Sequence, residues 1–521
     1  MATAAEGIVD EALAGLVHQF ADPMACFREL VQNAIDANSN EIDIRFAHEG
    51  GRLVIDVDDF GDGMDRRIID TRLTRLFSST KDDDRTKIGR FGIGFVSVFA
   101  LEPDVIRIDT SRAGEHWRVV FRPDRTFTRI ALPGPVDGTK IRIYKAATRE
   151  QAQEFAARAA AAIAFWCRHA SVEIRVDGRA INEPFDVPAR CKVDAEVGEA
   201  RIVAGYASDG VSRIGYYNRG LTLLEEASLE FPGVHLKLWS PVLEHTMTRD
   251  NVLRDDGYAR VMEQARKLIR GPLRERLLAA LAADVPASHR PGDPHEHLYA
   301  ALTELLARDD APAAARQRPF VRTIDGGLVD LATLARAKQK ERLWSAAAAT
   351  PVTKLLRERG DVVIAAAGES ALLALLRAAG AAPTPVEEAW FTATLVPTTA
   401  RPPGWPPLAT ALQALAGVAG VELGDLDYVG SPVARRVAVV QPSPGALTPV
   451  RKADALTPPG WLVLHDGHPL VREALALAER EPEFAALKLL KVFCLDRPDL
   501  STSRAIALTV AAVEARCRRM T

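Results

Sequence analysis

Three short segments within the first hundred residues hold the side chains best suited to chemistry. In the first segment, Glu29, Asn33 and Asp36 stand at i, i+4 and i+7, so a helix would place them on one face. Two carboxylates and an amide oxygen on one stripe suit a hydrated Mg²⁺ ion and an attacking water, because Mg²⁺ takes oxygen ligands and keeps several waters. Taken alone, the same stripe is also typical of the solvated face of a surface helix.

The second segment, Asp58–Met64, directly follows an apolar strand. Gly61 and Gly63 allow a sharp turn and the close approach of a ligand. Asp59 stands at the strand end, where its carboxylate could accept a hydrogen bond from an exocyclic amine. The alternative is a plain Asp/Gly turn.

The third segment, Gly89–Phe99, reads GRFGIGFVSVF and runs into an apolar helix. Backbone N–H groups at a helix N-terminus bind phosphate through unpaired donors and the helix dipole. The segment lacks the lysine of a P-loop, and no parallel βαβ unit surrounds it as a dinucleotide fold requires. On its own, this glycine pattern is a weak signal.

Hydrophobic periodicity predicts the elements that position these segments. The expected helices are Glu11–Phe20 and Met24–Ala37, and the expected strands are Glu41–Phe46, Arg52–Val57, Val105–Thr110, Trp117–Phe121, Thr128–Ala131 and Thr139–Tyr144. Helices layered on a mixed, mostly antiparallel sheet would make residues 1–149 an α/β sandwich, and the chain as a whole α+β.

An α/β middle domain is expected next, over residues 150–285. A long Ala-rich helix over Glu150–His169 opens this domain, and a helix over Gly257–Ala282 ends it. Four strands are expected between them, at Ser171–Val176, Ala200–Ala207, Gly215–Asn218 and His235–Trp239.

The remaining residues predict a helix-rich region over 295–380 and a C-terminal α/β region over 381–521. Pro286–Pro294 has linker composition, and Pro383–Pro407 has the composition of a loop or linker. The last apolar helices, Phe484–Leu495 and Ala505–Ala515, predict either a dimer interface or a closed core.

Composition narrows the class of protein. Among the 521 residues, 66 Lys+Arg stand against 69 Asp+Glu, so no global basic field attracts nucleic acid or acidic lipid. Five cysteines without a CxxC pair argue against a zinc site or disulfide framework and suit a reducing cytoplasm. The acidic N-terminus lacks a signal-peptide pattern, and no uncharged apolar run reaches the roughly 18 residues that span a bilayer.

Together the three segments resemble the Bergerat nucleotide-binding fold of the GHKL ATPases, which include gyrase, heat shock protein 90, histidine kinases and MutL. The motifs ExxxNxxDA, DxGxGM and GxFGxGF occur in the family's order at Glu29–Ala37, Asp59–Met64 and Gly89–Phe95. A fourth segment, Gly138–Ile141, is similar to the family's GT[K/R]I strand. The resemblance covers residues 5–180 and implies a Mg²⁺-dependent ATPase that binds ATP.

The resemblance also implies a role for each motif residue. Glu29 would act as general base for the water that attacks the γ-phosphate, and Asn33 would ligate Mg²⁺. Asp59 would accept a hydrogen bond from the adenine amine. The remaining nucleotide contacts would come from Asp36, Gly61, Gly63, Met64, Lys81, Gly89, Phe91, Gly92, Ile93, Gly94, Phe95 and Thr139.

Within the superfamily, the GRFGIGFVSVF segment is most similar to the heat shock protein 90 chaperones. The stretch Met247–Leu253 resembles their middle-domain motif, which implies that Arg249 reaches the γ-phosphate of ATP. The alternative is an arginine in a surface ion pair. The chain beyond residue 290 matches no chaperone motif.

Two functions stay open on the sequence. One is a chaperone-like conformational-switch ATPase that acts on protein clients as a cytoplasmic homodimer, without a membrane partner. The other is a GHKL ATPase of MutL, MORC or topoisomerase type, coupled to nucleic acid or genome defence. The near-neutral charge and the FGIGF box at Phe91–Phe95 favour the first function. The direct step from Asn38 into strand Glu41–Phe46 favours the second.

Overall fold

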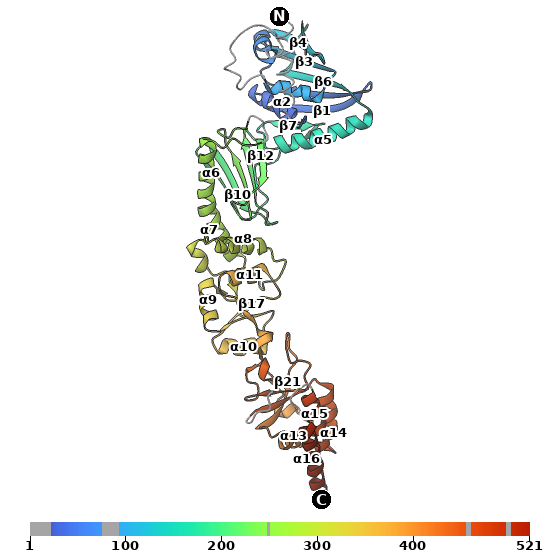
Figure 1. The fold of residues 1–521 in the computed structure, drawn as a ribbon, viewed down its shortest axis with the longest axis vertical. Coiled ribbons are helices and arrows are strands. Elements are labelled where there is room, and N and C mark those ends of the chain that lie inside the picture. Colours follow the sequence, from blue (N-terminus) through green and yellow to red (C-terminus); the bar gives the residue numbers. More distant parts are fainter. Residues whose placement is uncertain (1–21, 75–92, 247–250, 455–459, 496–501) are drawn as a thin grey trace. The chain divides into compact units, whose positions relative to one another are not determined.

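The computed structural model describes residues 22–74, 93–246, 251–454, 460–495 and 502–521 (Figure 1). Contacts divide the chain into two compact units, Met1–Arg276 and Leu277–Thr521. The division into four domains remains a prediction. Several predicted features lie outside the described residues, namely the helix Glu11–Phe20 and the site residues Lys81, Gly89, Phe91, Gly92 and Arg249.

An eight-stranded sheet forms the frame of the first unit, in the order β5-β4-β3-β6-β2-β1-β7-β8. Its neighbouring strands are antiparallel except β1 and β7, which run parallel, so the predicted mixed sheet is confirmed. The strands are β1 (Glu41–Glu49), β2 (Arg52–Asp59), β3 (Val105–Arg112), β4 (Glu115–Phe121), β5 (Phe127–Ala131), β6 (Thr139–Ala146), β7 (Glu173–Val176) and β8 (Arg179–Ala180).

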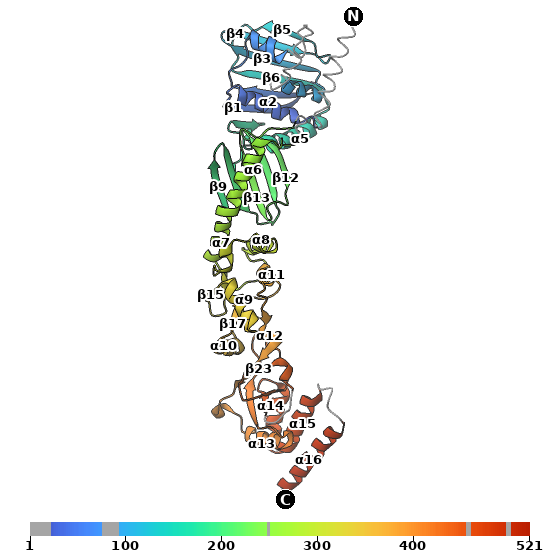
Figure 2. The ribbon, with the colours of Figure 1, turned by 60° about the vertical axis from the view of Figure 1, so that its left-hand side comes forward.

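Helices α2 (Ala25–Asp36) and α5 (Arg149–Cys167) pack against each other and share one core with the sheet (Figures 1 and 2). Helix α2 buries Phe27, Leu30 and Ala34, which recur at helical spacing. Helix α5 begins at a capping box in which Thr148 and Gln151 satisfy each other's backbone N–H groups. The shorter helices of this layer are α3 (Arg66–Ile68), the π-turn η1 (Ile69–Leu73), α4 (Ile93–Val96) and the 3₁₀ turn η4 (Ser97–Leu101).

A second sheet of five strands follows in the same unit, in the order β12-β11-β13-β10-β9. The helix expected over Gly257–Ala282 is interrupted by a π-turn, η5 (Ile269–Leu273), because Pro272 cannot donate a backbone hydrogen bond. The strands β9 and β12 were not predicted. The elements are β9 (Lys192–Val197), β10 (Ala200–Tyr206), β11 (Arg213–Asn218), β12 (Leu221–Ala227), β13 (Val234–Trp239), α6 (Asp256–Leu268) and α7 (Arg274–Ala283).

The second unit begins with helices around a small parallel sheet, in the order β17-β16-β18, which the sequence did not predict. The tract Pro286–Pro294 is built into this region, since His289 is fully buried and bridges to Ala366. The elements are α8 (Glu296–Ala307), the 3₁₀ turn η6 (Ala313–Arg316), β14 (Val321–Arg322), β15 (Leu328–Val329), α9 (Leu331–Gln339), β16 (Leu343–Ala346), α10 (Pro351–Glu358), β17 (Val362–Ala365) and α11 (Ala371–Ala378).

The last part of the chain contains a four-stranded sheet in the order β20-β21-β24-β22. The sheet contributes to two hydrophobic cores, and helices α13, α14 and α15 pack into the larger one. The prediction of a loop or linker over Pro383–Pro407 is wrong, because this tract forms several short helices and strands and fully buries Phe391. The elements are β18 (Thr384–Pro385), α12 (Val386–Ala389), β19 (Trp390–Phe391), β20 (Thr394–Leu395), η7 (Thr398–Ala400), α13 (Trp405–Ala416), β21 (Gly420–Asp425), β22 (Ala438–Gln441), β23 (Thr448–Pro449), η8 (Val450–Lys452), β24 (Trp461–His465), α14 (Pro469–Ala478), α15 (Pro482–Leu495) and α16 (Thr502–Met520).

Candidate active site

Helix α2 carries the first group of predicted site residues along a single stripe. The Glu29 side chain lies at the inner end of this stripe and is only 4% exposed, whereas Asn33 and Asp36 are exposed. The Asn33 carboxamide makes no hydrogen bond to any part of the chain that the structure describes. A buried carboxylate beside an open amide is an arrangement that can hold a water next to a metal-bound phosphate.

Asp59 is the last residue of β2, where it pairs in register with Ile42 of β1 and Thr139 of β6. Its carboxylate oxygen Oδ1 accepts hydrogen bonds from the backbone N–H groups of Gly61, at 3.0 Å, and Thr139, at 3.3 Å. Within the described residues neither bond uses Oδ2, which therefore remains available to a ligand. Burial raises the pKa of the Asp59 carboxyl, and the two backbone hydrogen bonds oppose that shift.

The turn after Asp59 is held by backbone contacts on both sides. The Asp62 N–H donates to the carbonyl oxygen of Ala37, just beyond α2, at 2.7 Å. Gly63 has φ +65°, and a Cβ at this position would lie 2.1 Å from the Ser111 carbonyl oxygen. Only glycine can therefore occupy position 63 in this turn. The DxGxG segment is thus clamped between α2 and β3.

A pair of threonines fastens the other side of the turn. The hydroxyl groups of Thr110, on β3, and Thr139, on β6, lie 3.1 Å apart and are both buried. The Met64 N–H donates to Thr110 Oγ1 at 2.8 Å. The structure thus brings Asp59, Gly61, Gly63, Met64 and Thr139 together beside the end of α2.

The structure describes the glycine segment only from Ile93 onwards. Ile93 and Gly94 open α4, which packs against α2. The Phe95 side chain is 6% exposed, and its ring centroid lies 5.4 Å from that of Phe121. Phe95 therefore lies in the hydrophobic core, where it anchors the end of the segment.

Arg28 is a buried charge that the sequence reasoning missed. Its side chain is 2% exposed, its Nη2 lies 3.3 Å from Oε1 of Glu29, and its guanidinium lies 5.0 Å above the Trp166 ring. Burial lowers its pKa to about 10, which leaves it charged at neutral pH. A signal was present in the sequence, because Arg28 stands four residues after Met24 and three before Val31, two apolar residues on the same helical face.

The second sheet of the first unit also reaches α2. Arg219, in the turn between β11 and β12, forms an ion pair with Asp36 at the end of α2. The neighbouring Gly220 has φ +80°, and a Cβ there would lie 2.1 Å from the His169 carbonyl oxygen. Asp36, predicted as a nucleotide contact, is therefore paired with an arginine of the second sheet.

The segment that leads toward Arg249 lies near the same helix. His245 pairs with Val252 in an isolated β-bridge, and the Thr246 N–H donates to the Asn251 carbonyl oxygen at 2.9 Å. Burial, with a contribution from the charge of Arg28, lowers the pKa of His245 to about 3. The described residues on both sides of Arg249 thus lie at a bridge close to Arg28.

No cluster of three or more His, Cys, Asp or Glu residues suited to a metal ion occurs in the described parts of the chain. Mg²⁺ that accompanies a nucleotide needs only one or two protein ligands, because phosphates and waters fill the other positions. The open carboxamide of Asn33 fits that requirement. Among the helices that the structure describes, none has the length and apolar character to cross a membrane.

Comparison with protein families supports the class that this fold and site define. Residues 24–125 match the family described as histidine kinase-, DNA gyrase B-, and HSP90-like ATPase. The match begins just before α2 and ends after β4, so it contains Glu29, Asn33, Asp59 and Gly63. A search of curated proteins found no match to the chain. The chain therefore carries an ATPase domain of the GHKL type.

Proposed function

We propose that this protein is a Mg²⁺-dependent, heat shock protein 90-like ATPase that couples ATP hydrolysis to a change of conformation. The observation that carries the proposal is the rigid turn at Asp59, whose Oδ2 is available to an adenine amine beside the helix of Glu29. Asp59 accepts a hydrogen bond from the adenine amine, Asn33 ligates Mg²⁺, and Glu29 orients and deprotonates the attacking water. When bound, Mg²⁺ neutralises charge on the phosphates.

Arg28 gives Glu29 a fixed place in this mechanism. A carboxylate next to a buried guanidinium keeps its orientation, because turning away would leave an unpaired charge in the core. Glu29 can therefore meet the attacking water without a large rearrangement.

Arg249 is the proposed sensor of the γ-phosphate. It stands four residues after His245, and four residues span at most roughly 14 Å of extended chain. The Arg28 charge contributes to the lowered pKa of His245, which supports a position near α2 for the start of that span. Arginine suits the role because its planar fork binds phosphoryl oxygens in pairs.

A substitution at position 249 tests the sensor. We expect Arg249→Ala to lower ATP turnover at least about tenfold, near the lower edge of what arginine fingers contribute, and to leave ADP affinity unchanged. Arg254→Ala is the control, since Arg254 lies five residues further on and its Nη2 lies 3.9 Å from Oε1 of Glu226. Normal turnover in Arg249→Ala would exclude the sensor role.

The proposed assembly is a homodimer in the cytoplasm, and helix α16 supports it. Its exposed residues Ile506, Val510, Val513, Cys517 and Met520 recur at alternating spacings of four and three. That spacing is the a/d seam of a coiled coil. The other side of α16 is held by α15 and by ion pairs such as Arg516–Glu481, at 2.6 Å, so the seam is left for a second copy.

Protein clients are the proposed substrates, and nucleic acid is the alternative. The short connection from α2 to β1, where Asn38 adopts φ +61°, favours the MutL- or MORC-type alternative. Measuring ATP turnover with an unfolded protein and with DNA separates the two. We expect stimulation by unfolded protein, and stimulation by DNA alone would assign the protein to the second class.

A further inference from the structure

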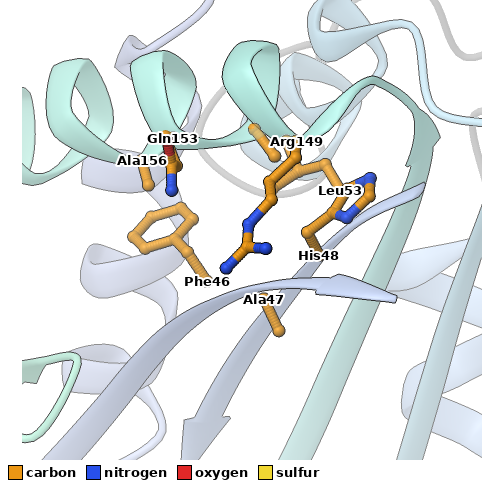
Figure 3. Close-up of a pocket in the computed structure, with 8 residues that line it drawn as sticks. Phe46, Ala47, His48, Leu53, Arg149, Gln153 and Ala156 are labelled. Carbon is orange, nitrogen blue, oxygen red and sulfur yellow. The ribbon is translucent and has the colours of Figure 1, made fainter. Parts of the chain in front are cut away.

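A separate pocket of about 420 Å³ lies between the first half of α5 and the β1–β2 hairpin (Figure 3). This volume is within the range of about 300–1,000 Å³ that is typical of small-molecule sites. Leu53, near the start of β2, lines the pocket, whereas Asp59 is the last residue of the same strand. Six residues of strand correspond to about 20 Å, so the pocket is not part of the nucleotide site.

One side of the pocket is apolar. Phe46 of β1 and Leu53 of β2 lie across it from Ala156 of α5 (Figure 3), and Ala152 of the same helix also lines it. Phe46 is only partly buried by its neighbours Phe27 and Phe155, whose ring centroids lie 5.8 Å and 6.3 Å away. The two alanines on α5 leave room that a larger side chain would fill. An occupant would therefore cover the remaining exposed part of the Phe46 ring.

The other side carries polar groups that point into the pocket. Figure 3 shows the Arg149 guanidinium reaching toward Ala47, between Phe46 and His48. Among the described residues, Arg149 has no ion pair or hydrogen bond to its side chain.

The neighbouring charges do not neutralise Arg149. Hydrogen bonds from its own backbone N–H and from Thr148 lower the pKa of Glu150, so this carboxylate is engaged at the N-terminus of α5. Nε2 of His48 lies 3.0 Å from the Ala147 carbonyl oxygen and donates to it. The guanidinium of Arg149 is thus an unmatched cation beside an apolar wall.

We propose that this pocket binds a small amphipathic carboxylate. The carboxylate pairs with the fork of the Arg149 guanidinium, which matches its two oxygens. The apolar body lies between Phe46 and Leu53 on one side and the alanines of α5 on the other. Gln153, whose side chain also faces the pocket, supplies a further hydrogen bond.

The test uses 2-naphthoate as the probe and the full chain as the receptor. Titration calorimetry in excess ADP, which occupies the nucleotide site, should show saturable binding of one probe per chain. The neutral analogue 2-naphthylmethanol should bind at least about tenfold more weakly, because it cannot form the charge-assisted pair. Absence of saturable binding, or equal affinity for the two compounds, would overturn the proposal.

Variants of α5 complete the test. Arg149→Gln should weaken 2-naphthoate binding at least about tenfold. Arg158→Gln is the matched control, because Arg158 is exposed and nine residues further along, on the opposite side of the helix. Ala156→Phe should also abolish binding by filling the pocket, while circular dichroism confirms that each variant is folded. Undiminished binding by Arg149→Gln or by Ala156→Phe would assign the probe to a different place.

Discussion

Helices α2 and α16 depart from the usual division between buried apolar and exposed polar side chains in opposite ways. Helix α2 buries Arg28 and Glu29, at 2% and 4% exposure, beside its apolar face. Helix α16 exposes Ile506 and Val510, at 58% and 50%. Buried charges cost desolvation unless they are paired, and exposed apolar stripes favour association. Such departures mark places where function, and not stability of the isolated chain, decides the residue type.

The two departures call for different partners. In the proposed mechanism a nucleotide pairs with the polar groups of α2, because Asn33 and the turn at Asp59 leave hydrogen-bonding groups open next to them. In the proposed homodimer, another apolar surface of similar length covers the stripe of α16. The following four expectations test this contrast, from the largest effect to the smallest.

Removing the carboxylate of Glu29 should have the largest effect. We expect Glu29→Gln, whose amide oxygen can still accept a hydrogen bond from the buried Arg28, to lower ATP turnover at least about 100-fold, the usual scale for a general base. ATP affinity should remain close to that of the original chain, because the adenine contact of Asp59 and the proposed Mg²⁺ ligand Asn33 are retained. A coupled ATPase assay with parallel calorimetry measures both quantities. Unchanged turnover would mean that another group activates the water.

Asp59→Asn tests the contact with adenine instead of the hydrolysis step. The amide presents an NH₂ group in place of an acceptor, which leaves polar groups unpaired at about 1–3 kcal/mol. ATP affinity should therefore fall about 5- to 150-fold, since about 1.4 kcal/mol corresponds to tenfold. Calorimetric titration gives the affinity, and circular dichroism checks the fold. An affinity equal to that of the original chain would remove Asp59 from the adenine site.

Val510→Glu tests the exposed apolar stripe of α16, the second helix of the comparison. A carboxylate in the apolar seam of a dimer would be buried without a partner, so self-association should weaken about tenfold or more. Ala507→Glu is the matched control, because it adds the same charge on the exposed flank of α16 that already carries Glu514 and Arg518. Analytical ultracentrifugation should separate the two variants. Equal sedimentation of both would argue for a monomer or for a dimer formed elsewhere.

The ion pair between Arg219 and Asp36 should give the smallest effect. It lies at the surface, with 57% and 32% of the two side chains exposed, so it contributes about 0–1 kcal/mol. We expect Arg219→Ala to change ATP turnover by at most about fivefold, consistent with that energy. Arg213→Ala is the control, since Arg213 pairs with Asp209 within the second sheet. Identical turnover in both variants would limit the pair to a structural role.

Local patterns predicted the ATPase domain well, because its chemistry lies at element ends. Strand β2 ends at Asp59, two residues beyond the end at Val57 that periodicity predicts, and helix α2 ends at Asp36, one residue before the predicted end at Ala37. The clustering of Asp59 with Thr139 depends on β2 pairing with β6, some 80 residues apart. The resemblance to a known family assigned both residues to one nucleotide site, but the strand pairing itself was not predicted.

Other features could not be derived from local patterns. Strand β9 has an intermediate or exposed residue at five of its six positions, so its apolar signal is weak. The proline-rich tract Pro383–Pro407 predicts a loop or linker, but a short strand such as β18 can contain proline because it lies at the edge of its sheet. The partnership of Arg219 with Asp36 joins residues that are 183 positions apart, and no single-sequence rule connects them.

The glycine at position 63 has a consequence for how this site could change in the laboratory or in evolution. A Cβ at Gly63 would lie 2.1 Å from Ser111 O, and a Cβ at Gly138 would lie 2.1 Å from Asp59 O. Both obstacles are backbone atoms, which cannot rotate away. A library randomised at the two positions and screened for folded protein should therefore return glycine at both, whatever nucleotide is offered. New base preferences would have to arise through side chains such as Met64, which can vary while the turn itself stays fixed.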